Sequence, residues 1–401
     1  MKRKALFFLL VLVAVLALSA CGGASLECTD ELGCVEVAPG EPVVLASSLV
    51  ISGPNTELGL DSQYGVEVAL ALRDDVLGHP VDLQAEDDGC SAEGGQTSAT
   101  KIVSNPQVVA MIGTSCSGAG VPAAKIISDA GYAMVSPSNT SPALTDPDQF
   151  QVGYLRTAHN DNIQGRAMAE FAINELGVTK AAAIHDGDPY TEGLASVFAA
   201  AFEELGGEIV AFEAEAPDAS NVEPLLTSVA AAGPEIIYFP VFIDLGSRIT
   251  NSAKDIPGLE GVILAAADGV QSPSFLENTV GTSDGMYASG PDLGFSNALY
   301  QDEFLPKYRE LAGGDTTAPF HAHAFDATYM VLDAIEAEGV TQQGSDGTLL
   351  IGRQALRDAL YATSGMEGIT GTITCDEYGD CADPKITVNE VQNNAFVPVW
   401  P

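Results

Sequence analysis

The chain has 401 residues, enough for two domains of ordinary size. It carries 55 acidic residues against 16 Lys and Arg, a formal net charge of −39. A surface so acidic repels nucleic acid and anionic lipid head groups, so neither is expected as a partner. Because the acidic residues are scattered, they indicate a solvated surface rather than an acidic tail.

The first twenty residues have the pattern of a targeting segment. A positively charged start is followed by an apolar run from Ala5 to Leu18, which is too short to span a bilayer comfortably. The run ends in L-S-A-C at Cys21, which looks like a bacterial lipobox. We therefore expect 1–20 to be a lipoprotein signal peptide, with acylated Cys21 anchoring the protein to the extracytoplasmic membrane face, in a periplasm or at the cell surface. A plain secretory signal is the alternative.

Seven cysteines are present, and removing Cys21 leaves an even number in a chain that is expected to be exported. Proximity in the sequence favours three disulfides, although other connectivities stay open. The favoured pairs are Cys28 with Cys34, Cys90 with Cys116, and Cys375 with Cys381. Spacing typical of a zinc site does not occur, so no metal is expected. Residues 21–42 lack periodicity and are expected to form an acylated tether.

From residue 43 onward, apolar strand-like runs alternate with helical patterns. This alternation favours parallel β-α units and doubly wound sheets, an α/β fold. The series runs twice, with a changeover near 156–161, so two similar lobes are expected. In the first series we expect strands at 43–51, 81–85, 108–113 and from 133, and helices at 62–75, 93–105 and 122–129. In the second we expect strands at 181–185, 209–214, 236–239 and 262–266, and helices at 162–176, 190–205, 221–232 and 245–254.

The later chain continues with a strand from Met286. Helices are expected near 297–311, 321–338 and 353–362. The end of the chain alternates in the manner of strands at 369–374, 385–388 and 396–399.

A loop rich in glycine and serine, G-T-S-C-S from Gly113, follows the uncharged strand expected at 108–113. Such a turn points backbone N–H groups outward, where a carboxylate or phosphate can bind. Pro122 suits the first position of a following helix. Considered alone, the loop is more simply an ordinary strand-to-helix connection. A second hydroxyl-rich loop, V-S-P-S-N-T, runs from Val135 to Thr140.

Seven stretches, in order, resemble the type I substrate-binding proteins of ABC transporters, and most closely the leucine/isoleucine/valine-binding branch. The resemblance covers 43–399. Its motifs are S-G-P-N-T-E-L-G (52–59), E-D-D-G-C (86–90), V-A-M-I-G-T-S-C-S (109–117), M-V-S-P-S-N-T-S-P-A-L-T (134–145), R-T-A-H-N-D-N-I-Q-G (156–165), I-H-D-G-D-P-Y-T-E-G-L (184–194) and F-D-A (325–327).

The resemblance implies a periplasmic binding protein type I fold, in which two Rossmann-like lobes are joined by a three-crossing hinge and close on a ligand. The N-terminal lobe would comprise 43–158 and 290–383, and the C-terminal lobe 159–289 and 384–401. Such a protein acts as a monomer, needs no cofactor, and delivers an amino acid to permease subunits in the membrane.

The resemblance also implies the ligand contacts in the N-terminal lobe. Ser117 would meet the ligand carboxylate with its N–H and hydroxyl groups. The Ser138 carbonyl and the Thr140 hydroxyl would accept hydrogen bonds from the ammonium. The disulfide between Cys90 and Cys116 matches one of the family and would brace the loop beside Ser117.

In the C-terminal lobe, Tyr190 corresponds to an aromatic residue that faces the ligand, and Asp268 to an acidic partner of the ammonium. Phe242 and Phe320 fall near positions that wall the side-chain pocket. Glu57 departs from the pattern, because it stands where the branched-chain binders place an aromatic ring. A carboxylate there either points to solvent or marks a more polar ligand.

The physical chemistry of a zwitterion agrees with these assignments, since both charges must stay solvated when the ligand is buried. Structural alternatives remain open: Tyr190 as a packing residue, Asp268 as a helix cap, and the phenylalanines as core. His321 and His323 face different ways on a helix, which disfavours a metal site. The G-x-S-x-G elbow and the Walker lysine are both absent, so an enzyme is not expected. A short amide, urea or an aromatic acid is the alternative ligand, and sensing is the alternative to transport.

Overall fold

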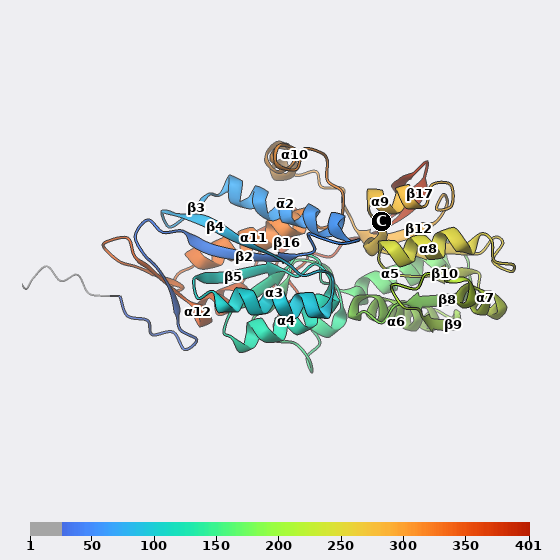
Figure 1. Cartoon of the computed structure of the whole chain (residues 1–401), viewed down its shortest axis with the longest axis horizontal. Coiled ribbons are helices and arrows are strands. Elements are labelled where there is room, and N and C mark those ends of the chain that lie inside the picture. The colour runs from blue at the N-terminus through green and yellow to red at the C-terminus, as the bar shows by residue number, and fades with distance from the viewer. Residues whose placement is uncertain (1–25) are drawn as a thin grey trace, which may run out of the picture.

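The computed structural model describes residues 26–401, and two sheets lie end to end in it (Figure 1). The first sheet has the strand order β3-β4-β2-β5-β6-β7, parallel except for the β3–β4 pair. Every residue of β5 is buried, as its uncharged sequence predicts for a strand covered on both faces. The strands are β3 (Asp75–Val76), β4 (His79–Asp87), β2 (Val43–Leu49), β5 (Val108–Gly113), β6 (Ala133–Ser136) and β7 (Tyr154–Arg156), and the covering helices are α2 (Thr56–Leu72), α3 (Ala92–Ser104), α4 (Ser117–Asp129), α11 (His321–Glu336) and α12 (Arg353–Tyr361).

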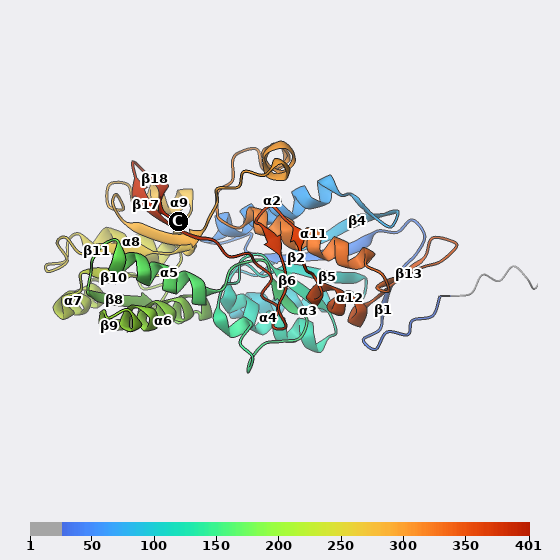
Figure 2. The same cartoon turned by 180° about the vertical axis from the view of Figure 1, so that it is seen from behind.

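The second sheet has the order β18-β17-β12-β11-β10-β8-β9, in which β12, β17 and β18 pair antiparallel. Helices cover both of its faces, so this lobe repeats the doubly wound plan of the first (Figure 2). Its strands are β8 (Lys180–His185), β9 (Glu208–Ala214), β10 (Ile236–Tyr238), β11 (Ile263–Ala266), β12 (Tyr287–Pro291), β17 (Ile386–Gln392) and β18 (Ala395–Trp400), and its helices are α5 (Asp161–Asn174), α6 (Pro189–Glu204), α7 (Glu223–Ala232), α8 (Ile243–Ala253) and α9 (Pro273–Asn278). The α/β fold predicted from the sequence is confirmed.

Three chain segments cross between the sheets and form the hinge. The first leads from β7 into α5, the second leaves β12, and the third enters β17. Between the second and third crossings lie η3 (Leu299–Phe304), α10 (Leu305–Ala312), α11, β13 (Thr341–Gln343), β14 (Leu349–Gly352), α12, β15 (Met366–Glu367) and β16 (Thr372–Ile373). The N-terminal lobe therefore consists of two separate stretches of chain, and the carboxyl end of the protein returns to the other lobe.

The segment expected to be a tether contains a strand. β1 (Cys34–Val37) pairs antiparallel with β14, and Val35 and Val37 are buried in the core of the N-terminal lobe. Four residues are too few to establish a period-two pattern in the sequence, so only the distant partner strand reveals this element. The anchoring role predicted for Cys21 concerns a residue outside the described range.

Helix α4 begins five residues earlier than expected. Its first residue is Ser117, and Pro122 lies inside the helix. The prediction took the proline as the start because proline suits the first position of a helix. The preceding S-G-A-G has weak helix propensity. Packing overrides that propensity: a Cβ atom on Gly120 would lie 2.3 Å from the Asn139 side-chain oxygen, so only glycine fits there. The earlier start places Ser117 on the first turn of the helix.

All three predicted disulfides are present, joining Cys28 to Cys34, Cys90 to Cys116, and Cys375 to Cys381. Within residues 26–401, no helix has the length and apolar composition needed to cross a bilayer.

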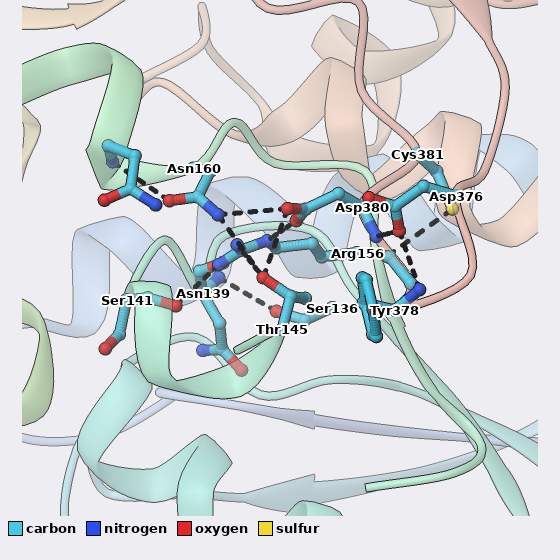
Figure 3. A network of polar contacts seen from close by, with 12 residues as sticks. Ser136, Asn139, Ser141, Thr145, Arg156, Asn160, Asp376, Tyr378, Asp380 and Cys381 are labelled. Atoms are coloured by element: carbon cyan, nitrogen blue, oxygen red, sulfur yellow. Dashed lines mark hydrogen bonds and ion pairs between the residues drawn. The ribbon is translucent and has the colours of Figure 1, made fainter. Parts of the chain in front are cut away.

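Arg156 connects the hinge with a loop of the N-terminal lobe (Figure 3). Its side chain is fully buried and pairs with Asp380 of the third crossing. It also donates to the carbonyl oxygens of Asn139 at 3.2 Å and Ser141 at 2.8 Å. Burial acts to lower the pKa of Arg156, but the Asp380 carboxylate outweighs it and raises that pKa above the usual value. The pair thus fastens two hinge crossings to one loop.

We expect Asp380→Asn to lower the free energy of unfolding by about 3 kcal/mol, because it leaves the Arg156 charge buried without a countercharge. Urea denaturation measures the change. Asp383→Asn is the matched control, since Asp383 pairs with Lys385 where both side chains are about half exposed, at 46% and 59%. An exposed pair contributes less than about 1 kcal/mol. Equal losses in the two variants would contradict this role for Arg156.

Candidate functional site

A small cavity lies between the lobes, at the carboxyl ends of the strands. Its volume is about 20 Å³, room for about one water molecule, so a larger solute enters only when the lobes separate. Six residues named from the sequence line it: Ser117, Ser138, Tyr190, Phe242, Asp268 and Phe320. Leu58, Ser115, Cys116 and Gly269 complete the lining.

The loop before α4 forms one wall of the cavity. Buried Asp88 holds this loop, because its carboxylate accepts hydrogen bonds from Ser115 N at 2.6 Å and from Cys90 N at 2.8 Å. Burial raises the pKa of Asp88 to about 7. The disulfide from Cys90 to Cys116 fixes the same loop covalently. Ser117 therefore presents its hydroxyl and the first turn of a 13-residue helix to the cavity, a favourable place for a carboxylate.

The second hydroxyl-rich loop lies beside the first. The Ser138 hydroxyl donates to Ser115 O at 2.8 Å, and Ser117 Oγ accepts from Ser141 N at 3.2 Å. Thr140 belongs to the same loop but lies behind the lining, with its carbonyl oxygen bonded to Asp161 N at 2.9 Å. Arg156 donates hydrogen bonds to the carbonyl oxygens of this loop, so the wall of the cavity and the hinge share one polar network.

Asp268 of the C-terminal lobe faces these loops. Its Oδ1 atom accepts from Gln164 Nε2 at 2.7 Å and from the Tyr190 hydroxyl at 3.2 Å. The Tyr190 oxygen in turn accepts from Gly269 N at 3.2 Å. Because Asp268 is 95% buried, desolvation raises its pKa to about 6 despite these hydrogen bonds. The sequence left open that Asp268 caps the helix near Ser272. In the structure Ser272 itself is the N-cap of that helix, α9.

Sequence reasoning missed Asp161, the first residue of α5. It is fully buried, and neither carboxylate oxygen has a hydrogen-bond partner within residues 26–401. The Thr140 hydroxyl lies beside it, and this hydroxyl and the charge of Arg156 both act to lower the pKa of Asp161. Burial and, secondly, the charge of Asp268 raise the pKa of Asp161 well above its usual value. In the sequence, an Asp that follows Asn160 is typical of the first turn of a helix, so nothing marked Asp161 as a residue of the site.

These groups define the chemistry that the site can perform. Asp268, which lines the cavity, and Asp161, a buried carboxylate that does not line it, form a negative pole that a cation can satisfy. The first turn of α4 and the Ser117 hydroxyl form a pole for an anion. A small molecule carrying both charges satisfies both poles at once, whereas an uncharged molecule satisfies neither.

The apolar part of the lining comes from both lobes. The Tyr190 and Phe242 rings lie 5.3 Å apart, and Phe320 closes the other side. Leu58, and not Glu57, is the residue in the first turn of α2 that lines the cavity. The side chains of neighbouring helical residues point about 100° apart. Leu58 therefore lines the cavity while Glu57, one residue earlier, lies at its rim. The Glu57 carboxylate instead accepts from Ser274 N at 3.1 Å.

The histidines of α11 are part of the core. His321 Nδ1 lies 2.9 Å from the Asp61 carboxylate, and its Nε2 lies 3.1 Å from the Tyr300 hydroxyl. Burial lowers the pKa of His323 to about 3, which keeps it neutral. Among residues 26–401, no group of three or more potential ligands has metal-binding geometry.

Two hinged α/β lobes that close over a cavity with opposite charged poles define a solute-binding protein rather than an enzyme. A family model described as periplasmic binding protein matches residues 42–394, and the chain belongs to this family. Its site of action is therefore outside the cytoplasm.

The relatives match most of this chain, and this chain covers most of each relative. "Leu/Ile/Val-binding protein homolog 3" of Brucella melitensis is 25% identical over 341 residues, covering 84% of this chain and 88% of the relative. The "Leucine-, isoleucine-, valine-, threonine-, and alanine-binding protein" of Pseudomonas aeruginosa is 25% identical and covers 88% and 91%. A leucine-binding protein LivK of Thermotoga maritima superposes with a TM-score of 0.79 at 25% identity, covering 89% and 97%.

We expect Asp161→Asn to raise the stability of the ligand-free protein. The carboxylate is costly when ionised, because its folded pKa is raised above the unfolded value. The melting temperature should rise by about 2–4 °C at pH 8, where the group is most ionised. The gain should shrink toward pH 5, where the carboxyl of the parent protein takes up its proton. Calorimetric melting at both pH values tests this, and a loss of stability at pH 8 would contradict it.

Proposed function

We propose that the protein captures an L-amino acid with a short apolar side chain, of the leucine, isoleucine and valine class. One observation carries the proposal: Asp268 lines the cavity together with Ser117 of the first turn of α4, and a second buried carboxylate, Asp161, lies close enough for the charge of Asp268 to raise its pKa. An α-ammonium group neutralises the carboxylates, and the α-carboxylate accepts from Ser117. Leu58, Phe242 and Phe320 then surround an aliphatic side chain, which supplies apolar burial without hydrogen-bond demands.

The captured amino acid is then delivered to an ABC transporter. The names of relatives support this role, as does a LivJ structure of Streptococcus pneumoniae in complex with isoleucine, of the same fold with a TM-score of 0.75 at 21% identity. The ligand bridges both lobes and so shifts the population toward the closed form. The closed form is the one that permease subunits in the membrane would recognise.

Aromatic acids are the competing ligand class, because a benzoate complex from R. palustris has the same fold with a TM-score of 0.74. Benzoate has no ammonium group. Its binding would leave Asp161 and Asp268 uncompensated beside a new buried anion, a costly arrangement at neutral pH. The acidic pair thus favours a zwitterion.

A thermal-shift and calorimetric screen tests the proposed function. The twenty amino acids, acetamide, urea, benzoate and 4-hydroxybenzoate are compared at pH 7.5. Leucine, isoleucine or valine should raise the melting temperature most, because a ligand that binds only the folded state stabilises it by mass action. Binding of benzoate or urea with no response to any amino acid would overturn the proposal.

Ser117→Ala should weaken leucine binding by about 1–3 kcal/mol, because a charged carboxylate loses one hydrogen-bond donor. Isothermal titration calorimetry measures the change. Ser104→Ala, an exposed serine at the end of α3, is the control and should bind as the parent does. Unchanged affinity in Ser117→Ala would remove Ser117 from the ligand contacts.

We also propose that Cys21 carries the lipid and that the protein acts as a monomer, since one chain supplies the whole cavity. Light scattering of the soluble protein should give the mass of one chain.

Cys21→Ser should release the protein from the membrane fraction of expressing cells, because the polypeptide would lose its acyl anchor. Fractionation and immunoblotting measure this, with Cys28→Ser as the control that keeps the acylation site. Membrane retention of Cys21→Ser would contradict the anchor.

A further inference from the structure

Asp188 occupies a junction between the lobes without lining the cavity. It is the N-cap of α6, and its Oδ1 atom accepts from Tyr190 N at 2.8 Å. The other side of the carboxylate faces Gly118, in the first turn of α4 of the opposite lobe. A Cβ atom on Gly118 would lie 2.0 Å from Asp188 Oδ2, and its three nearest neighbours would all be atoms of Asp188.

Two helices from different lobes therefore direct their first turns at one carboxylate. The N–H groups of Tyr190 and Gly118 both lower the pKa of Asp188, although burial is the larger effect and raises it to about 6. The positive ends of α4 and α6 would repel each other across the cleft without a charge between them. The Asp188 carboxylate compensates both ends when the lobes meet.

A second carboxylate makes a reciprocal contact elsewhere on the rim. Glu57 lies in the first turn of α2, in the N-terminal lobe, and accepts from Ser274 N of the C-terminal lobe. Asp188 thus reaches from the C-terminal lobe to the N-terminal one, and Glu57 reaches in the opposite direction. Neither residue lines the cavity.

We propose that Asp188 and Glu57 are closure residues, which fasten the two lobes to each other and set the lifetime of the closed form independently of the ligand side chain. They are positioning residues: they hold the walls together and leave selectivity to the cavity lining. This inference rests on the proposed function only where its tests measure amino-acid affinity. The contacts themselves lie between protein groups.

Asp188→Asn tests the charge with little change of shape. Asparagine is as good an N-cap as aspartate, so α6 keeps its first turn. Its amide, however, can accept from only one of the two N–H groups and presents an NH₂ group to the other. Leucine affinity should fall about tenfold or more, as expected for a lost charged hydrogen bond. Glu192→Gln, at an exposed site on the same turn, removes the same charge and should bind as the parent does.

Gly118→Ala tests the close approach, and a double variant tests its cause. Alanine should block the closed form and weaken leucine binding by about a hundredfold or more, because real Cβ atoms do not tolerate a 2.0 Å contact. Asp188→Ala removes the obstructing atoms. The Gly118→Ala, Asp188→Ala double variant should therefore bind more tightly than Gly118→Ala alone, a rescue that damage to α4 itself would not show.

Glu57→Ala should weaken leucine, isoleucine and valine by the same factor. A loss that differs among the three would make Glu57 a selectivity residue and overturn its role in closure. Unchanged affinity in Asp188→Asn, or a double variant no better than Gly118→Ala, would overturn the role of Asp188.

A measurement of lobe distance separates this inference from the proposed function. Spin labels on cysteines replacing exposed Lys125 and Lys254, one in each lobe, report the closed population with and without leucine. If the parent binds no amino acid, the proposed function fails, and the ligand-free distances decide the inference. A closed population that Gly118→Ala lacks supports it. Equal populations in the two proteins, or none in the parent under either condition, overturn it.

Discussion

A carboxylate removed from water is costly unless a positive group meets it, and the cleft of this protein depends on that constraint. Asp161, Asp188 and Asp268 all have raised pKa values, and burial is the main cause for each. Arg156, the fully buried cation nearby, is already paired with Asp380. The binding site is thus an unfinished electrostatic arrangement. In the proposed function a ligand cation completes it, and the lobes that close around that cation exclude the water which would otherwise solvate it.

The same constraint explains how the fold supports the site. Arg156 neutralises the hinge and at the same time holds the carbonyl oxygens of Asn139 and Ser141. Asp88 does the equivalent for the loop before α4, together with a disulfide. Loops held by these contacts on one lobe face an acidic pair on the other, and in the proposed function this couples ligand binding to closure. In the proposed function, the stability lost by burying the Asp161 carboxylate is recovered when a cation binds.

Much of the fold could be predicted from the sequence, because apolar strand-like runs alternate with helical patterns over nearly the whole chain. Local signals failed where distant partners decide the structure. β1 is too short to recognise without β14. α4 begins at Ser117 although its first turns contain glycines, which close packing requires and which weaken its helix propensity. The cavity lining was largely predicted through the family resemblance. Asp161 was not, because burial and the lack of hydrogen-bond partners are properties of the fold, and Glu57 was named where its neighbour Leu58 lines the cavity.

The pairing of β1 with β14 has a mechanical consequence. Asp30, just before β1, accepts from Gln354 N and Ala355 N at the start of α12, each at 2.9 Å, so the entering chain is tied to the N-terminal lobe at two places. This attachment lies at the end of the molecule away from the second sheet, where Figure 2 labels β1 and α12. A pull transmitted along the entering chain therefore reaches only one lobe. The other lobe can swing about the hinge while its neighbour stays in place, and strain at the point of attachment does not spread the cleft.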